Sequence, residues 1–431
     1  MRVLLIGNGG REHALAWKLS ASPGVTALYA LPGNPGTAQV ADNVPNIAVM
    51  EFDKIERFIR QNKIEFVVIG PEDPLAAGLA DRLEAAGVKV FGPKKEAAQL
   101  EADKWFAKEL MRHQAIPTAE ARIFTDVSHA EEYVRIREGG VVIKAVGLAK
   151  GKGVAVCHRP ADALDAIDQI MRKRIYGDAG DRIVIEEVLT GPECSVLAFV
   201  DRRNIYIMET AQDHKPIDDG DTGPMTGGMG AYSPTPAVTS AILSQIERDV
   251  FIPMLDGLNR EGIDYRGVLY AGLMLTNNGP KVLEFNCRFG DPETQPLMMR
   301  LKSDLLPTML AVSESRLDQI ELNWDPRPAL CVVASSRGYP GAYETGKVIT
   351  GIDQADSMRD VKVFHAGTTW RDGQRERNGP IYTNGGRVLA VTAIADTIAA
   401  AQMRAYEAIG KIHFDGMHYR KDIGHHAIRG V

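Results

Sequence analysis

The sequence contains no block of basic residues and no long apolar run. The 431-residue chain carries 50 Lys and Arg against 56 Asp and Glu, a formal net charge of −6. Affinity for a nucleic-acid backbone rests on clustered positive charge, so the composition gives no indication of a nucleic-acid partner. No stretch approaches the roughly 20 consecutive apolar residues that a membrane-spanning helix needs, and no cationic leader precedes the first apolar run. We therefore expect a cytoplasmic protein without a membrane partner.

Cysteine is also scarce. The four cysteines are far apart in the chain, at Cys157, Cys194, Cys287 and Cys331. They form neither a C-x-x-C pair nor a Cys/His pattern of the kind that holds zinc. Isolated thiols of this kind are typical of buried cysteines in a reducing compartment, so we expect neither disulfides nor a zinc site built on cysteine.

The length of the chain predicts two to four domains, because 431 residues are too many for one compact core. In the first hundred residues, short apolar runs such as RVLLIG and FVVIG alternate with helix-periodic stretches such as REHALAWKL. This alternation predicts a doubly wound parallel sheet. Further along the chain, strands follow one another with turn signals, which is typical of antiparallel α+β structure. The last hundred residues combine β runs with one long helical stretch and predict a smaller α+β domain.

The N-terminal GNGGREH motif lacks two features of a dinucleotide-binding turn. Gly7 and Gly9 occupy the first two positions of G-x-G-x-x-G, but Glu12 occupies the third. No acidic residue that could hold a ribose follows the second predicted strand, where the sequence reads ALYALPGNPG. The backbone N–H groups of the turn, with Arg11 beside them, suit a phosphate monoester instead. The alternative, in which the glycines only permit a tight turn, leaves Arg11 and His13 unexplained.

A second glycine-rich run, KAVGLAKGKGVAV, is not a P-loop. A P-loop requires G-K-[ST] at the start of a helix, whereas a β-rich run follows Gly153. The pattern predicts a turn between two antiparallel strands that carries Lys144, Lys150 and Lys152. Two interpretations stay open: a lid that closes over nucleotide phosphates, or a surface hairpin with solvated lysines.

The run KVLEFNCRFGDPETQP predicts a site for a divalent cation. Glu284 and Asn286 lie two residues apart and therefore on one face of a strand, and Mg²⁺ prefers such oxygen ligands. Arg288 follows directly and suits a carboxylate or an acyl phosphate. A half-exposed strand with outward polar residues would explain Glu284, but not the close spacing of Arg288, Asp291 and Glu293.

The run QDHKPIDDGDTGPMTGGMGAYSP is rich in glycine and proline and predicts a long irregular loop. Loops of this length in compact chains are more often functional than idle. Asp213, His214 and Lys215 lie at its start. His214 is either an acid–base group or a positioning residue.

Taken in order, these stretches resemble the phosphoribosylamine–glycine ligase family, the ATP-grasp enzymes of purine biosynthesis. The most specific runs are DTGPMTGGMGAYSP and LEFNCRFGDPETQP, and others extend from VLLIGNGGREHALAWKL to RKDIGHHAI, so the likeness covers essentially the whole chain. It implies an α/β preATP-grasp domain over residues 1–102 and a two-lobed α+β ATP-grasp domain over 103–325, whose lid lobe spans about 118–188. A small C-terminal α+β domain over residues 326–431 completes the architecture.

The resemblance also implies a reaction, in which ATP phosphorylates the glycine carboxylate and the amine of 5-phosphoribosylamine displaces phosphate. ATP and Mg²⁺ or Mn²⁺ are implied as cofactors, and we expect a monomer that makes transient contacts with neighbouring enzymes of the pathway. The implied catalytic residues are Lys144, Asp213, Lys215, Arg288 and Asp291, and the implied metal ligands are Glu284 and Asn286. The implied ATP-binding residues are Lys104, Lys144, Gly147, Gly151, Lys152, Gly153, Glu186, Glu187, Val188, Leu189 and Glu193. The implied substrate-binding residues are Gly9, Gly10, Arg11, Glu12, Gly228, Met229 and Arg288.

The sequence departs from the family pattern in the lid and in the long loop. Val146 stands at the acidic position of K-A-D-G-L-A-x-G-K-G, Lys150 is added within the turn, and Met225 stands where Asn is common. We expect Val146 to shape the hairpin rather than to contact ATP. Three alternatives stay open: another ATP-grasp carboxylate–amine ligase with a different acceptor, an oxidoreductase built on the N-terminal turn, and a binding protein without catalysis.

Overall fold

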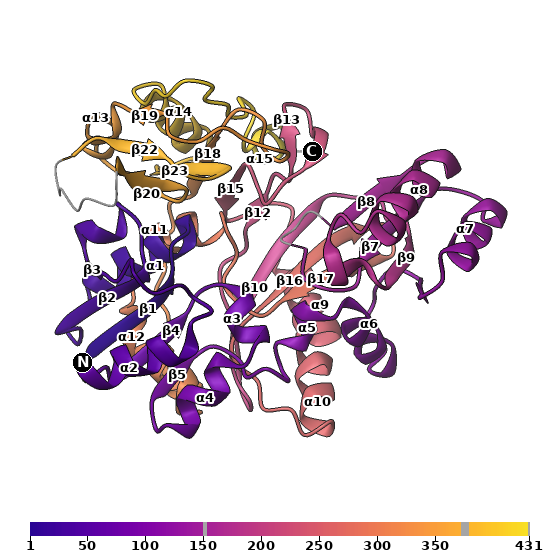
Figure 1. Cartoon of the computed structure of the whole chain (residues 1–431), viewed down its shortest axis with the longest axis horizontal. Coiled ribbons are helices and arrows are strands. Elements are labelled where there is room, and N and C mark those ends of the chain that lie inside the picture. The colour runs from indigo at the N-terminus through magenta and orange to yellow at the C-terminus, as the bar shows by residue number, and fades with distance from the viewer. Residues whose placement is uncertain (150–152, 372–378, 430–431) are drawn as a thin grey trace.

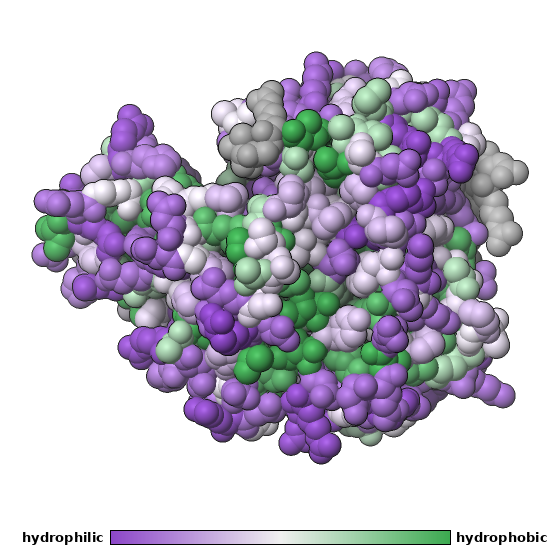
Figure 2. All heavy atoms as spheres, turned by 180° about the vertical axis from the view of Figure 1, so that it is seen from behind, coloured by the Kyte–Doolittle hydropathy of each residue, from purple (hydrophilic) through white to green (hydrophobic). Residues whose placement is uncertain are grey.

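The computed structural model describes residues 1–149, 153–371 and 379–429. The N-terminal sheet and the C-terminal sheet lie at one side of the molecule, and the lid sheet lies at the other (Figure 1). Seen from behind, the surface is hollowed between the lid and the C-terminal region (Figure 2). No helix in the three described ranges is long and apolar enough to cross a membrane.

The N-terminal sheet is parallel throughout, with strand order β3-β2-β1-β4-β5, which confirms the predicted doubly wound sheet. Successive β1 side chains point to opposite faces: Val3 and Leu5 pack with Leu15 of α1, while Leu4 and Ile6 join a second core. The elements are β1 (Arg2–Gly7), α1 (Gly10–Ser20), β2 (Ala27–Pro32), η1 (Thr37–Gln39), β3 (Asp42–Asn43), α2 (Phe52–Asn62), β4 (Phe66–Ile69), α3 (Glu72–Ala76), α4 (Leu79–Ala85) and β5 (Lys89–Phe91).

The lid sheet is antiparallel, with strand order β6-β9-β7-β8 and its own apolar core against α7 and α8. Lys144 pairs with Val154 across β7 and β8, which confirms the predicted antiparallel strands beside the glycine-rich turn. The elements are β6 (Ala121–Phe124), α7 (Val127–Ile136), β7 (Val141–Ala145), β8 (Val154–Cys157), α8 (Pro160–Ile167), η2 (Asp168–Arg172), η3 (Gly177–Gly180) and β9 (Ile183–Glu187).

The central sheet is also antiparallel, with strand order β11-β10-β16-β17, and α5, α6 and α10 pack residues such as Leu100, Leu110 and Met254 against it. All four cysteines are buried and free of disulfides, as expected. The elements are α5 (Gln99–Ala102), α6 (Lys104–His113), β10 (Glu193–Asp201), β11 (Ile205–Ile207), α9 (Ser240–Ile246), η4 (Glu247–Phe251), α10 (Ile252–Arg260), β16 (Arg266–Thr276), β17 (Gly279–Asn286), α11 (Thr294–Arg300), α12 (Leu305–Ser313) and η5 (Leu317–Gln319).

The C-terminal sheet includes two strands from the middle of the chain, in the order β12-β15-β18-β23-β20. The prediction of an irregular loop for this middle segment was therefore wrong. Its last strand, β15, pairs with β18, and β13 and β14, which lie between β12 and β15 in the chain, pair with each other as a hairpin. The segment's members are β12 (Gln212–Asp213), β13 (Pro216–Asp218), β14 (Thr222–Met225) and β15 (Gly230–Ser233). The remaining elements are β18 (Ala329–Ser335), β19 (Val348–Ile349), α13 (Ile352–Asp356), β20 (Val361–His365), β21 (Thr368–Trp370), β22 (Ile381–Thr383), β23 (Arg387–Ile394), α14 (Ile398–Ile409) and α15 (His425–Arg429).

Candidate active site

A cavity of about 370 Å³ lies where the four sheets approach one another. Side chains reach it from α1 and α3 beside the N-terminal sheet, and from the lid, the central sheet and the C-terminal sheet. The sequence-predicted residues that line it are Arg11, Lys104, Lys144, Gly153, Glu186, Glu187, Val188, Leu189, Glu193, Asp213, Lys215, Glu284, Asn286, Arg288 and Asp291.

Some predicted site residues lie elsewhere. Met229 is fully buried in the core of the C-terminal sheet, and the carbonyl of Gly228 accepts a hydrogen bond from Arg387. The carbonyl of Gly147 accepts a hydrogen bond from Lys104 Nζ at 3.2 Å. The predicted residues outside the cavity wall are Gly9, Gly10, Glu12, Gly147, Gly228 and Met229, whereas Gly151 and Lys152 lie outside the described residues.

Two lysines meet at one carboxylate on the lid side of the cavity, and a third, Lys104, lines the cavity with them. Glu186 of β9 accepts from Lys144 Nζ at 2.9 Å and from Lys108 Nζ at 3.1 Å. Burial lowers the pKa of Lys104, and it lowers the pKa of Lys108 to about 8. Lys108 was missed by the sequence analysis, although it lies one turn after Lys104 on α6, and that spacing is the signal that identifies it. The arrangement concentrates positive charge beside the lid.

An apolar slot adjoins these lysines. Val188 and Leu189 follow β9 and line the cavity together with Val154 and Val156 of β8 and Met274 of β16. An apolar slot at the end of a strand, with backbone groups at its edge, suits a flat heterocyclic base. Val146, in contrast, is buried and does not line the cavity; its carbonyl accepts from the backbone N–H of Lys104 at 3.0 Å. This placement agrees with a role in shaping the hairpin.

Glu284 and Asn286 lie at the end of β17 and both line the cavity. Burial alone would raise the pKa of Glu284, but Lys215, Lys144 and Lys104 hold it below its usual value, so the carboxylate is ionised. Lys215 Nζ lies 3.7 Å from the Glu284 carboxylate. An ionised carboxylate and an amide oxygen two residues apart fit the oxygen ligands that a hard divalent cation requires.

Arg288 is held in place by two carboxylates that the sequence analysis missed. Its guanidinium lies 2.8 Å from Glu101 and 3.3 Å from Glu72, and it donates to the Asn286 side chain at 3.1 Å. Burial raises the pKa of Glu101 to about 7. Because Glu72 and Glu101 belong to helices far from Arg288 in sequence, no local pattern identifies them. The guanidinium is therefore fixed before any ligand arrives.

A group of carboxyls and hydroxyls lies next to Lys215. Burial, together with the nearby Glu293 and Glu193 carboxylates, raises the pKa of the Asp213 carboxyl to about 8, although Lys215 acts in the opposite direction. Tyr270 donates its hydroxyl to Glu293 at 2.9 Å. This part of the cavity holds more negative groups than positive ones, so it favours an added cation.

The N-terminal turn encloses the carboxylate of Glu12. That carboxylate accepts from the backbone N–H of Gly9 at 2.7 Å and from the Arg11 side chain at 2.6 Å. A Cβ atom at Gly70 would lie 2.2 Å from a Glu12 carboxylate oxygen, and one at Gly7 would lie 2.4 Å from the Glu12 Cγ. The glycines therefore make room for Glu12, while Arg11 reaches the cavity.

Arg387 links the C-terminal sheet to the cavity. Its guanidinium donates to the carbonyls of Gly227 and Asp291, each at 2.6 Å, and lies 3.6 Å from the Asp291 carboxylate. Burial raises the pKa of Asp291, but Arg387 and Arg11 more than offset that effect and lower it. His214 does not line the cavity, which favours its interpretation as a positioning residue.

Models of three phosphoribosylglycinamide synthetase domains match the chain in order. The N domain matches residues 1–101, the ATP-grasp (A) domain matches residues 102–294, and the C domain matches residues 329–426. Together they cover most of the sequence.

Two relatives named phosphoribosylamine–glycine ligase match along their whole length. The protein of Rhodopirellula baltica is 49% identical over 99% of this chain and 98% of its own, and that of Ralstonia nicotianae is 48% identical over 100% of both. The crystal structure of phosphoribosylamine–glycine ligase from Thermotoga maritima superposes with a TM-score of 0.82 at 34% identity, covering 98% of this chain and 100% of that one. The chain belongs to the phosphoribosylamine–glycine ligase family of ATP-grasp enzymes.

Proposed function

We propose that the protein joins glycine to 5-phosphoribosylamine with ATP, through a glycyl phosphate, and forms glycinamide ribonucleotide, ADP and phosphate. Family membership over the full length supports the overall reaction. The observation that supports the glycyl phosphate route is that Lys104 and Lys144 line one shared cavity together with Arg288 and Glu284. Phosphoryl donor and carboxylate acceptor can therefore be bound side by side.

The lid side of the cavity binds ATP in this proposal. Lys104 and Lys144 contact the phosphates, Glu186 orients both Lys144 and Lys108, and Glu193 contacts the ribose. The apolar slot beside Val188 and Leu189 takes the adenine. Glu186 therefore holds Lys144 in place before ATP binds.

Glu284 and Asn286 would hold Mg²⁺ or Mn²⁺, because their donors are an ionised carboxylate and an amide oxygen. When bound, the cation would neutralise charge on the phosphate oxygens. Arg288 and Lys215 then offset the remaining charge on the glycine carboxylate as it accepts the phosphoryl group.

The group around Asp213 suits the glycine ammonium. The carboxyls of Asp213, Glu193 and Glu293 outnumber the one cation Lys215, and burial together with these neighbouring carboxylates raises the pKa of Asp213. An ammonium group placed there would restore the balance, while Arg288 binds the carboxylate at the other end of the same molecule. Lys215, which belongs to the Asp213 group, lies 3.7 Å from Glu284, so this group adjoins the proposed cation site.

The N-terminal side of the cavity receives 5-phosphoribosylamine. Arg11 supplies a cation for its phosphate, and the ionised Asp291 carboxylate accepts a hydrogen bond from the attacking amine. Asp291 is held by the Gln295 side chain at 2.9 Å and by the backbone N–H of Arg11 at 3.3 Å, so its orientation is fixed. Gly9, Gly10, Glu12, Gly228 and Met229 support this subsite from outside the cavity wall.

An ADP-release assay in which each substrate is omitted in turn tests this function. We expect ADP to form at the full rate only when ATP, glycine and 5-phosphoribosylamine are all present. Rapid ADP release without glycine would contradict the assignment. Full activity with a different amine in place of 5-phosphoribosylamine would favour another ATP-grasp carboxylate–amine ligase.

A further inference from the structure

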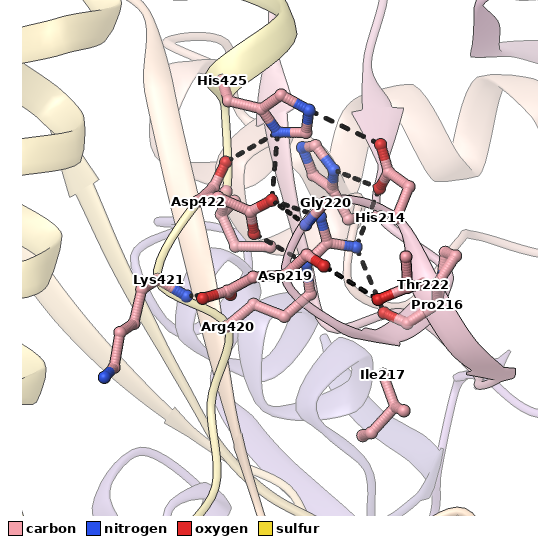
Figure 3. Close-up of polar contacts among 12 residues, drawn as sticks. His214, Pro216, Ile217, Asp219, Gly220, Thr222, Arg420, Lys421, Asp422 and His425 are labelled. Carbon is pink, nitrogen blue, oxygen red and sulfur yellow. Dashed lines mark hydrogen bonds and ion pairs between the residues drawn. The ribbon is translucent and has the colours of Figure 1, made fainter.

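A second polar cluster lies outside the active site, where the C-terminal tail meets the hairpin of β13 and β14 (Figure 3). The backbone N–H of Gly220 donates to Asp422 at 2.8 Å, and that of Lys421 donates to Asp219 at 2.7 Å. Arg420 is fully buried beneath these contacts and lies 2.9 Å from Asp221. The tail is thus bound to the tip of the hairpin by several independent contacts.

Two imidazole nitrogens of the C-terminal tail lie close to one carboxylate oxygen of Asp221. Oδ2 of Asp221 lies 2.8 Å from His426 Nε2 and 3.5 Å from His425 Nε2. Zinc bonds to nitrogen and carboxylate oxygen are about 2.0–2.2 Å long, so neighbouring donors in a tetrahedral site lie about 3.3–3.6 Å apart. The Asp221–His425 pair has this spacing, whereas the Asp221–His426 pair is at hydrogen-bond distance and would separate by about 0.5 Å when an ion binds. Among the described residues, this cluster with His214 is the one group of three or more His, Cys, Asp or Glu residues whose donor atoms all lie within 4.8 Å of one another.

Hydrogen bonds fix which atoms are free to bind a metal. His425 Nδ1 lies 2.9 Å from the carbonyl of Asp422, and donation to that carbonyl leaves the Nε2 lone pair directed at Asp221. Metal-bound histidines usually donate their other nitrogen in this way. His214 differs, because its Nε2 accepts from the backbone N–H of Gly424 at 3.1 Å.

His214 therefore orients Asp221 instead of binding a metal itself. With Nε2 engaged, its Nδ1–H faces Oδ1 of Asp221 at 3.5 Å, and Arg420 binds the same oxygen. Oδ1 of Asp221 is thus occupied by two donors, whereas Oδ2 points to His425 and His426. This pattern, in which outer groups hold the ligating carboxylate, is typical of metal sites.

Charge and access also suit a cation. Asp221 and Asp422 carry two negative charges against the one positive charge of Arg420, and the histidines add none in their neutral form. The side chains of Asp221 and His426 are 34% and 29% exposed, so an ion can reach them from solvent. Imidazole ligands favour Zn²⁺ and similar ions over Mg²⁺, which separates this cluster chemically from Glu284 and Asn286.

We propose that Asp221, His425 and His426 form a binding site for a transition-metal ion of the Zn²⁺ class, with His214 and Arg420 holding Asp221 in position. Three protein ligands leave a coordination position for water. The ion clamps the C-terminal tail to the hairpin that leads into Met225, Thr226 and Gly227 at the cavity wall. The site is therefore a structural clamp next to the active site.

Titration of the metal-free full-length protein with Co²⁺ tests the proposal. We expect one Co²⁺ per chain, with visible d–d absorption of a site of low coordination number, which Zn²⁺ removes and which about a hundredfold excess of Mg²⁺ leaves in place. Zn²⁺ should also raise the thermal unfolding midpoint measured after treatment with a chelator.

The variants His425→Ala and His426→Ala should each weaken Co²⁺ binding at least about tenfold and abolish the Zn²⁺-dependent rise in midpoint. His129→Ala is the matched control, since His129 is 77% exposed on the lid and should leave binding unchanged. If His425→Ala does not fold, His426→Ala carries the test, because the His426 ring is partly exposed and its ion pair within the described part of the chain is with Asp221 alone. Absence of d–d absorption in the wild type, or its persistence in a folded His426→Ala variant, would overturn the proposal.

Discussion

Glu12 occupies the place at which the third glycine of a dinucleotide-binding turn would stand. Its carboxylate caps the N-terminus of α1 by accepting from Gly9, and it pairs with Arg11, so negative charge is already present where a pyrophosphate would bind. The turn keeps the strand–turn–helix geometry but not the binding function. The oxidoreductase alternative therefore loses its structural basis.

Replacing Gly70 tests this account of the turn. The added Cβ of Gly70→Ala would lie 2.2 Å from a Glu12 oxygen, so we expect a loss of about 1–3 kcal/mol in the free energy of unfolding. The same substitution in a Glu12→Ala background should cost clearly less, because the clashing group is gone. Urea unfolding of the four proteins measures the coupling. Equal costs in both backgrounds would show that Glu12 does not fill the turn.

Glu284→Gln tests the proposed cation site. The substitution keeps the size of the side chain but removes the anionic donor, so kcat at fixed Mg²⁺ should fall at least about tenfold, or ~1.4 kcal/mol. The Mg²⁺ concentration for half-maximal activity should rise. Glu321→Gln, at an exposed position far from the cavity in sequence, is the control and should leave both values unchanged. An unaltered Mg²⁺ dependence in Glu284→Gln would contradict the assignment.

At the scale of elements, α1 and β20 meet through a pair of buried histidines. The backbone N–H of His365 donates to His13 Nδ1 at 2.8 Å, and the carbonyl of His365 accepts from Asn34 at 2.9 Å. The Nε2 atoms of both histidines are buried without a hydrogen-bond partner. This contact explains His13, which the sequence left without a role: it joins the N-terminal sheet to the C-terminal sheet.

These histidines predict a loss of stability in acid. Burial lowers the pKa of His365 to about 4 and that of His13 well below 6.5, so the unfolded chain takes up protons that the folded chain does not. The contribution of these histidines to the free energy of unfolding is therefore fully present above pH 6.5. It is lost as the pH falls toward 4, by on the order of 3 kcal/mol for His365. Thermal midpoints of the wild type and His365→Asn across this range should converge as the pH falls. Parallel curves would contradict the prediction, and His129→Asn serves as an exposed control.

At the scale of the whole molecule, the candidate active site lies where several sheets meet. Lys144 comes from the lid, Glu284 from the central sheet, Arg11 from α1 beside the N-terminal sheet, and Arg387 from the C-terminal sheet. Domain placement therefore controls the geometry of the reacting groups, which is consistent with catalysis by positioning and charge.

The same fact explains what the sequence could and could not predict. The parallel sheet and the lid strands follow from local apolar periodicity, and Glu284 and Asn286 follow from strand spacing, so these features were accessible. The pairing of β15 with β18 joins residues about a hundred positions apart, and the glycine-rich β15 segment has no apolar alternation to reveal a strand. Glu101 and Arg387 were missed for a related reason, because only the tertiary structure brings them to Arg288 and Asp291.

The fate of the glycine carboxylate oxygens tests the central claim most directly. If a glycyl phosphate forms in the cavity, a carboxylate oxygen bonds to the γ-phosphorus of ATP and leaves with phosphate when the amine attacks. With glycine labelled by ¹⁸O in both carboxylate oxygens, mass spectrometry should find one ¹⁸O in each phosphate released and one in the glycinamide ribonucleotide. Phosphate without ¹⁸O, formed together with the amide product, would contradict the account.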